Sequence, residues 1–89
     1  MSVFDKPIEG LSQMTPDDLR ILKENLDGVV QITCIDGEII RANIISVSEE
    51  EGDIVFDLIS TNRPDKYEKL DQQPAYLLRF VHIASVQPG

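Results

Sequence analysis

Two spacings of apolar residues divide the chain, one typical of a helix and one typical of strands. Three leucines recur at intervals of three and four residues, which places them on one face of a helix: Leu19, Leu22 and Leu26. Thr15 can cap this helix, and Pro16 suits its first turn because an N–H there would have no partner. Gly28 can adopt the left-handed conformation that often follows a last helical turn. The pattern predicts a helix over 15–27, after an irregular lead-in over 1–14.

After the helix, apolar residues alternate with polar ones, as they do in strands with one buried face. The turn Asp36-Gly37 predicts a hairpin, and the following strand, 38–48, has apolar positions that change phase partway along. Such a change indicates a bend, which lets one strand serve both halves of a small barrel. Further strands are expected at 54–58, 75–81 and 83–86. The chain is therefore predicted to be mainly β, with a five-stranded, strongly bent antiparallel barrel over 29–86 and a long loop over 60–74.

The chain is also short and acidic. Its 89 residues, 42% of them hydrophobic, suffice for one core, so a single domain over 1–89 is expected. A core this small favours further burial by association with copies of the same chain. Sixteen acidic against eight basic side chains give a net charge of −8, and an acidic surface lacks the counterion release that favours nucleic-acid binding. RNA is therefore a disfavoured partner.

The sequence predicts neither a membrane nor a secreted location. No apolar run approaches the roughly 18 to 20 residues that cross a bilayer. Residues 1–13 lack the basic start and apolar stretch of a signal peptide. The single cysteine, Cys34, suits a reducing compartment, because small secreted domains usually carry paired cysteines. We therefore expect a cytoplasmic protein with no membrane partner, in which the Cys34 thiol is packed rather than reactive.

The order of these elements resembles the Sm and Sm-like (LSm) family over about residues 15–87. The positions that match the family's first motif are Asp36, Gly37, Ile40, Ala42, Ile44, Val47, Ser48 and either Gly52 or Asp53. Ala42 replaces a glycine of that motif and Ser48 replaces an aspartate. The second motif matches residues 78–86, with Phe80 in place of a glycine. The resemblance implies a divergent member, with an N-terminal α-helix followed by an Sm-like (SH3-like) barrel.

The same resemblance implies two functional surfaces. Family members that bind RNA hold a base with a loop Asn, a neighbouring aromatic or His, and an Arg; only Arg79 remains here, and Glu50 stands near the stacking position. Family rings form when the fourth strand of one copy pairs with the fifth strand of the next. The residues that would form such a subunit interface are Tyr76, Leu77, Phe80 and Val81. The alternative is that the chain's own helix or N-terminal segment covers this strand.

Candidate chemistry is sparse along the chain. The single His82 has no recognisable nucleophile or base beside it, so no catalytic residue and no cofactor are expected. The acidic run 49–53 lacks the ligand spacing of a calcium loop, so no metal is expected. A basic and aromatic cluster, Arg63, Lys66, Tyr67 and Lys69, could bind an acidic partner, although such a cluster is more often a solvated loop. Arg79 could form a salt bridge or contact an anion or base.

These observations favour a non-enzymatic, Sm-like binding and assembly module that forms a homo-oligomer, as a ring or otherwise. A protein partner is the next expectation. The alternative hypothesis is a divergent RNA-binding protein that uses Arg79 and the 63–69 loop.

Overall fold

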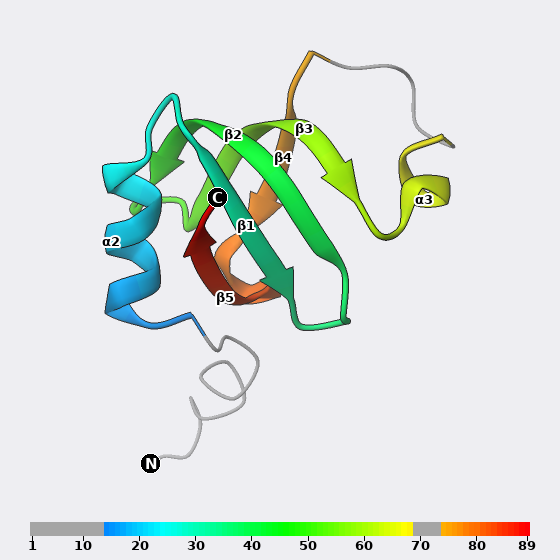
Figure 1. Cartoon of the computed structure of the whole chain (residues 1–89). Coiled ribbons are helices and arrows are strands. Elements are labelled where there is room, and N and C mark those ends of the chain that lie inside the picture. Colours follow the sequence, from blue (N-terminus) through cyan, green and yellow to red (C-terminus); the bar gives the residue numbers. More distant parts are fainter. Residues whose placement is uncertain (1–13, 69–73) are drawn as a thin grey trace.

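A computed structural model describes residues 14–68 and 74–89 of the chain. Within them a helix precedes five antiparallel strands (Figure 1), and two short helices interrupt the later strands. The elements are α2 Pro16–Glu24, β1 Val29–Cys34, β2 Ile39–Ser48, β3 Asp53–Thr61, α3 Pro64–Glu68, β4 Tyr76–Arg79, a 3₁₀ helix Phe80–His82 and β5 Ile83–Pro88. The strand order is β4-β3-β2-β1-β5. The predicted mainly β fold is confirmed, and the bent sheet stays open, with β4 and β5 as its two edges.

The start of α2 follows from its first residues. Thr15 accepts a hydrogen bond from the Asp18 N–H at 3.2 Å, and Asp18 accepts one from the Thr15 N–H at 2.9 Å. This reciprocal capping satisfies two donors that the first turn leaves without helical partners. Asp18 also accepts a hydrogen bond from the Val86 N–H of β5 at 3.1 Å, so the cap ties the helix to the sheet.

The predicted end of α2 is wrong by three residues. The helix ends at Glu24 rather than at 27, because the Asn25 side chain donates to the Ile21 carbonyl at 2.8 Å and closes the last turn. The left-handed residue after the helix is Asp27, with φ 62°, and not Gly28. Leu26 therefore leaves the apolar face of the helix and is 49% exposed.

The predicted bend in β2 is present. The pairing of β2 with β3 changes register between Arg41 and Ala42 and again between Ile44 and Ser46. Ile45 has no partner in this register and points outward, whereas Val47 packs against the core. Two bulges in one strand increase its twist, and the sheet curls until β4 passes behind β2 (Figure 1).

One apolar core lies inside the curved sheet. Its fully buried members come from α2, β1, β2, β3 and β5: Leu22, Val30, Ile32, Ile40, Ala42, Ile44, Ile54 and Ile83. Phe56 is the largest of the buried side chains and Leu78 brings β4 into the same core. The core therefore joins the helix and all five strands.

Several predicted boundaries need correction. β3 runs to Thr61, so the loop expected over 60–74 begins later, and α3 lies within it. The strand expected at 75–81 ends at Arg79, because a 3₁₀ turn follows in which the Ile83 N–H donates to the Phe80 carbonyl. The last strand continues past 86 to Pro88. Apart from Met14, the lead-in expected over 1–14 lies outside the described residues, as do loop residues 69–73. Within residues 14–68 and 74–89, no helix is long and apolar enough to cross a membrane.

Candidate functional site

The hairpin turn between β1 and β2 places a carboxylate inside the protein. Gly37 adopts φ 94°, a conformation that glycine tolerates best, and its N–H donates to the Cys34 carbonyl at 3.0 Å. The Asp36 carboxylate accepts the Glu38 N–H at 3.0 Å. This turn fixes the direction of Glu38, whose side chain is 0% exposed.

Three side chains donate hydrogen bonds to the buried Glu38 carboxylate. The Lys66 ammonium lies 2.7 Å from Oε1, while the Thr61 hydroxyl and the Tyr67 hydroxyl lie 2.7 Å and 2.8 Å from Oε2. Thr61 ends β3, and the other two donors come from α3. A buried carboxylate is stable only when it is paired and hydrogen-bonded, and Glu38 meets both conditions.

Arg63 joins the same hydrogen-bond network from the loop between β3 and α3. Its guanidinium donates to the Asp36 carbonyl at 2.7 Å and lies 3.5 Å from the Asp36 carboxylate. The backbone N–H of Arg63 also donates to the Thr61 hydroxyl at 3.1 Å, which connects Arg63 to the donors around Glu38. We call these residues the Glu38 cluster: Asp36, Glu38, Thr61, Arg63, Lys66 and Tyr67.

The Glu38 cluster contains three of the four ligand-contact residues that the sequence indicated. Arg63, Lys66 and Tyr67 lie together, and the acidic group they contact is Asp36 or Glu38 of the same chain. Arg79 lies elsewhere, on β4. Sequence reasoning missed Glu38 as the centre. Its position two residues before the inward-facing Ile40 was the available signal, because alternate strand positions share a face.

The environment sets the protonation state of each group in the cluster. Burial alone would raise the pKa of Glu38, but hydrogen bonds from Lys66, Thr61 and Tyr67 outweigh burial and lower that pKa. The hydrogen bond to Glu38 raises the pKa of Lys66. The pKa of Tyr67 is raised mainly by burial and secondly by its hydrogen bond to Glu38. At neutral pH, therefore, Glu38 is an anion, Lys66 a cation and Tyr67 a neutral donor.

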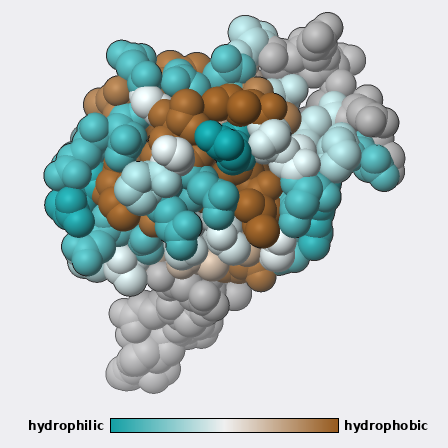
Figure 2. Space-filling model, in the orientation of Figure 1, coloured by the Kyte–Doolittle hydropathy of each residue, from teal (hydrophilic) through white to brown (hydrophobic). Residues whose placement is uncertain are grey.

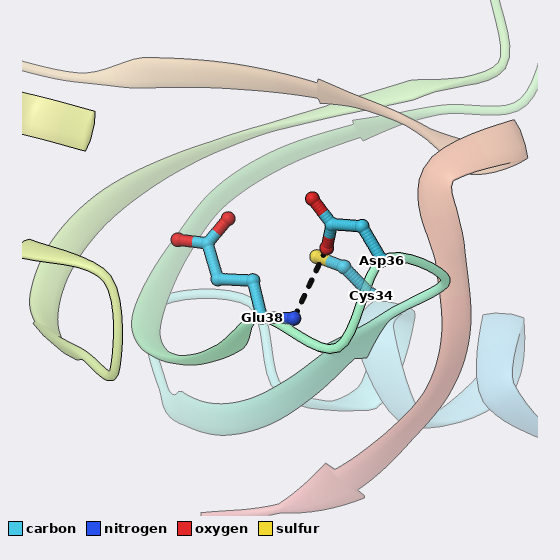
Figure 3. Close-up of side chains that lie close together, drawn as sticks. All are labelled: Cys34, Asp36 and Glu38. Atoms are coloured by element: carbon cyan, nitrogen blue, oxygen red, sulfur yellow. Dashed lines mark hydrogen bonds between the residues drawn. The ribbon is translucent and has the colours of Figure 1, made fainter.

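Cys34, Asp36 and Glu38 present potential metal ligand atoms within 4.8 Å of one another (Figure 3). Two observations disfavour a metal there. Both Glu38 oxygens already accept hydrogen bonds, one of them from the Lys66 cation. Burial, and then the Glu38 and Asp36 carboxylates, raises the pKa of Cys34 to about 11, so the thiol stays protonated at neutral pH. The donor set suits an internal ion pair better than a metal ion.

A pocket of about 230 Å³ adjoins the Glu38 cluster. It is lined by Cys34, Ile35, Asp36, Lys66, Leu78 and His82. Ligand sites for drug-sized molecules usually measure about 300 to 1,000 Å³, so this pocket is small for such a ligand. The His82 side chain is exposed, and its backbone carbonyl accepts the Ile35 N–H at 2.9 Å.

Aromatic contacts connect the Glu38 cluster to β4. The Tyr67 ring meets the Tyr76 ring edge-on at 5.2 Å between centroids, and Tyr76 meets Phe56 at 5.9 Å. Such pairs add to the stabilisation from burial alone. Tyr76, one of the predicted interface residues, is half-buried and contacts two aromatic rings of its own chain.

The other predicted interface residues differ in exposure. Leu77 is 59% exposed, whereas Phe80 and Val81 are half-buried, Phe80 against the core. Arg79 is exposed and lies opposite Asp53 in the pairing of β3 with β4. Among the described residues, no carboxylate lies within salt-bridge distance of its guanidinium.

The positions that the family resemblance assigns to base binding also come together. Arg79 lies beside Asp53, and the next residue, Phe80, donates its N–H to the Gly52 carbonyl at 2.8 Å. The turn before Gly52 carries three glutamates, of which Glu49 forms a salt bridge with Lys23 of α2 at 2.6 Å. This surface is acidic, which disfavours a phosphate backbone.

No family model and no curated protein matches the sequence. Among solved structures, the chain is similar to the crystal structure of an SmAP (LSm) protein from Methanococcus vannielii. The similarity has a TM-score of 0.57 at 12% sequence identity and covers 82% of this chain and 96% of that chain. The fold is Sm-like. At this identity the similarity extends to the path of the backbone, and the Glu38 cluster is argued from this chain's own contacts.

Proposed function

We propose that the protein is a non-enzymatic Sm-fold assembly module that associates with copies of itself through the outer edge of β4. The observation that carries this proposal is the open edge of β4 beside an exposed leucine. An unpaired strand edge offers N–H and C=O groups to another chain, and soluble proteins usually protect such edges.

The outward groups of β4 follow from its pairing. Phe80 donates its N–H to Gly52 on the β3 side, so the backbone groups of Tyr76 and Leu78 also face β3. Because the direction alternates along a strand, the N–H and C=O groups of Leu77 and Arg79 face outward. Among the described elements, none pairs with that side of β4.

Side chains beside this edge add an apolar contribution. Leu77 lies opposite Val55 of β3 on the outer face of the sheet, and more than half of its surface is exposed. Burying a leucine of this kind in an interface would stabilise the complex by up to about 1.5 kcal/mol per copy. Backbone pairing and apolar burial thus favour the same contact.

The RNA-binding alternative has weaker support. Arg63 and Lys66 are engaged with Asp36 and Glu38, so RNA would have to compete with these intrachain carboxylates. The turn beside Arg79 is acidic, and the net charge of the chain is −8. Both features oppose the phosphate contacts that drive most RNA binding.

Light scattering after size exclusion tests the proposal with two matched variants. Leu77→Lys places a charge on the β4 edge. Ile59→Lys places the same charge at a similarly exposed position of β3, 52%. Hydrophobic side chains gather on the face of the molecule that Figure 2 shows, so an apolar residue at the surface is not by itself evidence of an interface. We expect the wild type and Ile59→Lys to exceed the 10.0 kDa monomer mass at micromolar concentration, and Leu77→Lys to elute as a monomer. A monomeric wild type, or dissociation by Ile59→Lys alone, would refute the proposal.

A further inference from the structure

The pocket beside the Glu38 cluster combines an apolar wall with a charged rim. Cys34, Ile35 and Leu78 form the wall, and the first and last of these side chains are buried in the core. Ile35 is 42% exposed, so a ligand in the pocket would remove apolar surface from water. The polar lining residues, Asp36, Lys66 and His82, are all exposed and stand at the mouth of the pocket.

Two of the rim residues carry opposite charges. The Glu38 N–H lowers the pKa of Asp36, so the Asp36 carboxylate is ionised at neutral pH. The hydrogen bond to Glu38 raises the pKa of Lys66, which keeps the Lys66 ammonium protonated. Figure 3 shows the Asp36 carboxylate beside the Cys34 sulfur, on the same side of the hairpin as Glu38. An anion and a cation therefore border one apolar wall.

These two charges lie within reach of one small molecule. Oxygen atoms of Asp36 and Glu38 lie within 4.8 Å of each other, and the Lys66 ammonium lies 2.7 Å from Glu38. Both charged groups also have bonding capacity left. An ammonium has three N–H donors, of which Glu38 uses one, and each carboxylate oxygen can accept more than one hydrogen bond.

The charges around the pocket cancel. Arg63 and Lys66 are cations, and Asp36 and Glu38 are anions. A ligand with one net charge would pair with one sign and lie close to the other. A dipolar ligand pairs with both signs at once, since its ammonium meets a carboxylate and its carboxylate meets an ammonium.

From these features we propose that the pocket binds a free amino acid with a branched aliphatic side chain, of which leucine is the probe. The α-ammonium of the ligand contacts Asp36, its α-carboxylate contacts Lys66, and its side chain packs against Ile35 and Leu78. The volume of about 230 Å³ suits a ligand below drug size. A peptide separates its terminal amine from its terminal carboxylate, so a single residue fits both charges best. The inference goes beyond the proposed assembly function and does not rest on it.

NMR titration of the full chain with L-leucine tests the proposal. A ligand this small binds with a dissociation constant of about 0.1 to 1 mM, so the titration extends to about 10 mM. The backbone amide signals of Ile35, Asp36 and Leu78 should shift and saturate. The signals of α2, which does not line the pocket, should stay in place.

Two analogues of leucine each lack one of its charges. Isoamylamine has no carboxylate, and isocaproate has no ammonium. Each analogue should bind about tenfold more weakly than L-leucine, because each loses one charge-assisted contact.

Variants assign each charge to its residue. Asp36→Asn removes the anion but keeps an acceptor oxygen for the Glu38 N–H, so the turn is retained. It should weaken L-leucine about tenfold and leave isocaproate unchanged. Lys66→Gln should weaken L-leucine and isocaproate and leave isoamylamine unchanged. Asp57→Asn is the matched control, because Asp57 is an exposed aspartate of β3 that does not line the pocket.

Each outcome supports or overturns the proposal. Saturable shifts at the pocket that Asp36→Asn weakens and Asp57→Asn does not support it. The absence of saturation in folded wild type at about 10 mM refutes it, as does equal affinity for L-leucine and either analogue. Equal weakening by both aspartate variants indicates a general effect of charge and also refutes it. Should Asp36→Asn fail to fold, the two analogues on the wild type decide. Self-association of the wild type is a separate result, which tests the assembly function alone.

Discussion

Removing the Glu38 carboxylate should destabilise the fold by about 3 kcal/mol. In Glu38→Ala, the hydroxyls of Thr61 and Tyr67 lose an ionised acceptor, at about 1.5 kcal/mol each. The Lys66 pair adds about 0.5 kcal/mol or less, because its ammonium side chain is 49% exposed and solvent screens it. Neighbouring contributions of this kind are not fully additive, which favours the lower end of the sum.

Urea unfolding followed by circular dichroism measures this effect. For a domain of this size, about 3 kcal/mol corresponds to a melting temperature lower by about 12 to 24 °C. Glu50→Ala is the matched control, because it removes an exposed glutamate from a turn and should change the free energy of unfolding by less than about 0.5 kcal/mol.

Glu38→Gln refines the interpretation. The amide keeps the shape and one acceptor oxygen but loses the charge that Lys66 contacts. Its loss in the free energy of unfolding should therefore fall between the losses for Glu50→Ala and Glu38→Ala. A free energy of unfolding for Glu38→Ala within about 1 kcal/mol of wild type would refute the view that Glu38 holds α3 against the hairpin.

Three other measurements probe separate parts of the structure. Because the pKa of Glu38 lies below its ordinary 4.5 in the folded protein, its stabilisation is complete above about pH 5 and is lost as pH falls through the folded pKa. The loss of stability in acid should be smaller for Glu38→Gln than for wild type; what remains includes Asp36, whose pKa is also lowered. Thr15→Ala should lower the free energy of unfolding by about 1 kcal/mol through loss of the α2 cap, and an unchanged urea midpoint would contradict that role. Cys34, buried and with its pKa raised to about 11, should react with a disulfide reagent only after denaturation; rapid reaction of the native protein would contradict this burial.

Local signals explain why much of the fold could be predicted from the sequence. Thr15 and Pro16 mark the start of α2, the Asp36-Gly37 turn marks the first hairpin, and the change of phase in β2 marks its bend. Each of these features is decided by residues close together in the chain. The end of α2 was misjudged because Asn25 caps it with a side chain, where a glycine was expected.

The candidate site was only half predictable, for a physical reason. Its cationic and aromatic members could be recognised as a cluster in the sequence, but their partner Glu38 lies 28 residues before Lys66. A charged residue after a turn is normally solvated, and only tertiary packing shows that this one is buried. The Asp18 contact with β5 spans 68 residues and is equally invisible to local patterns.

Amide hydrogen exchange at low and high protein concentration shows whether β4 is the open edge used for assembly. The N–H groups of Leu77 and Arg79 should exchange rapidly in dilute protein and become protected as the protein concentration rises. The Val86 N–H, held by Asp18, should be unaffected. Concentration-dependent protection at Val86, or none at Leu77 and Arg79 in associated protein, would contradict assembly through the edge of β4.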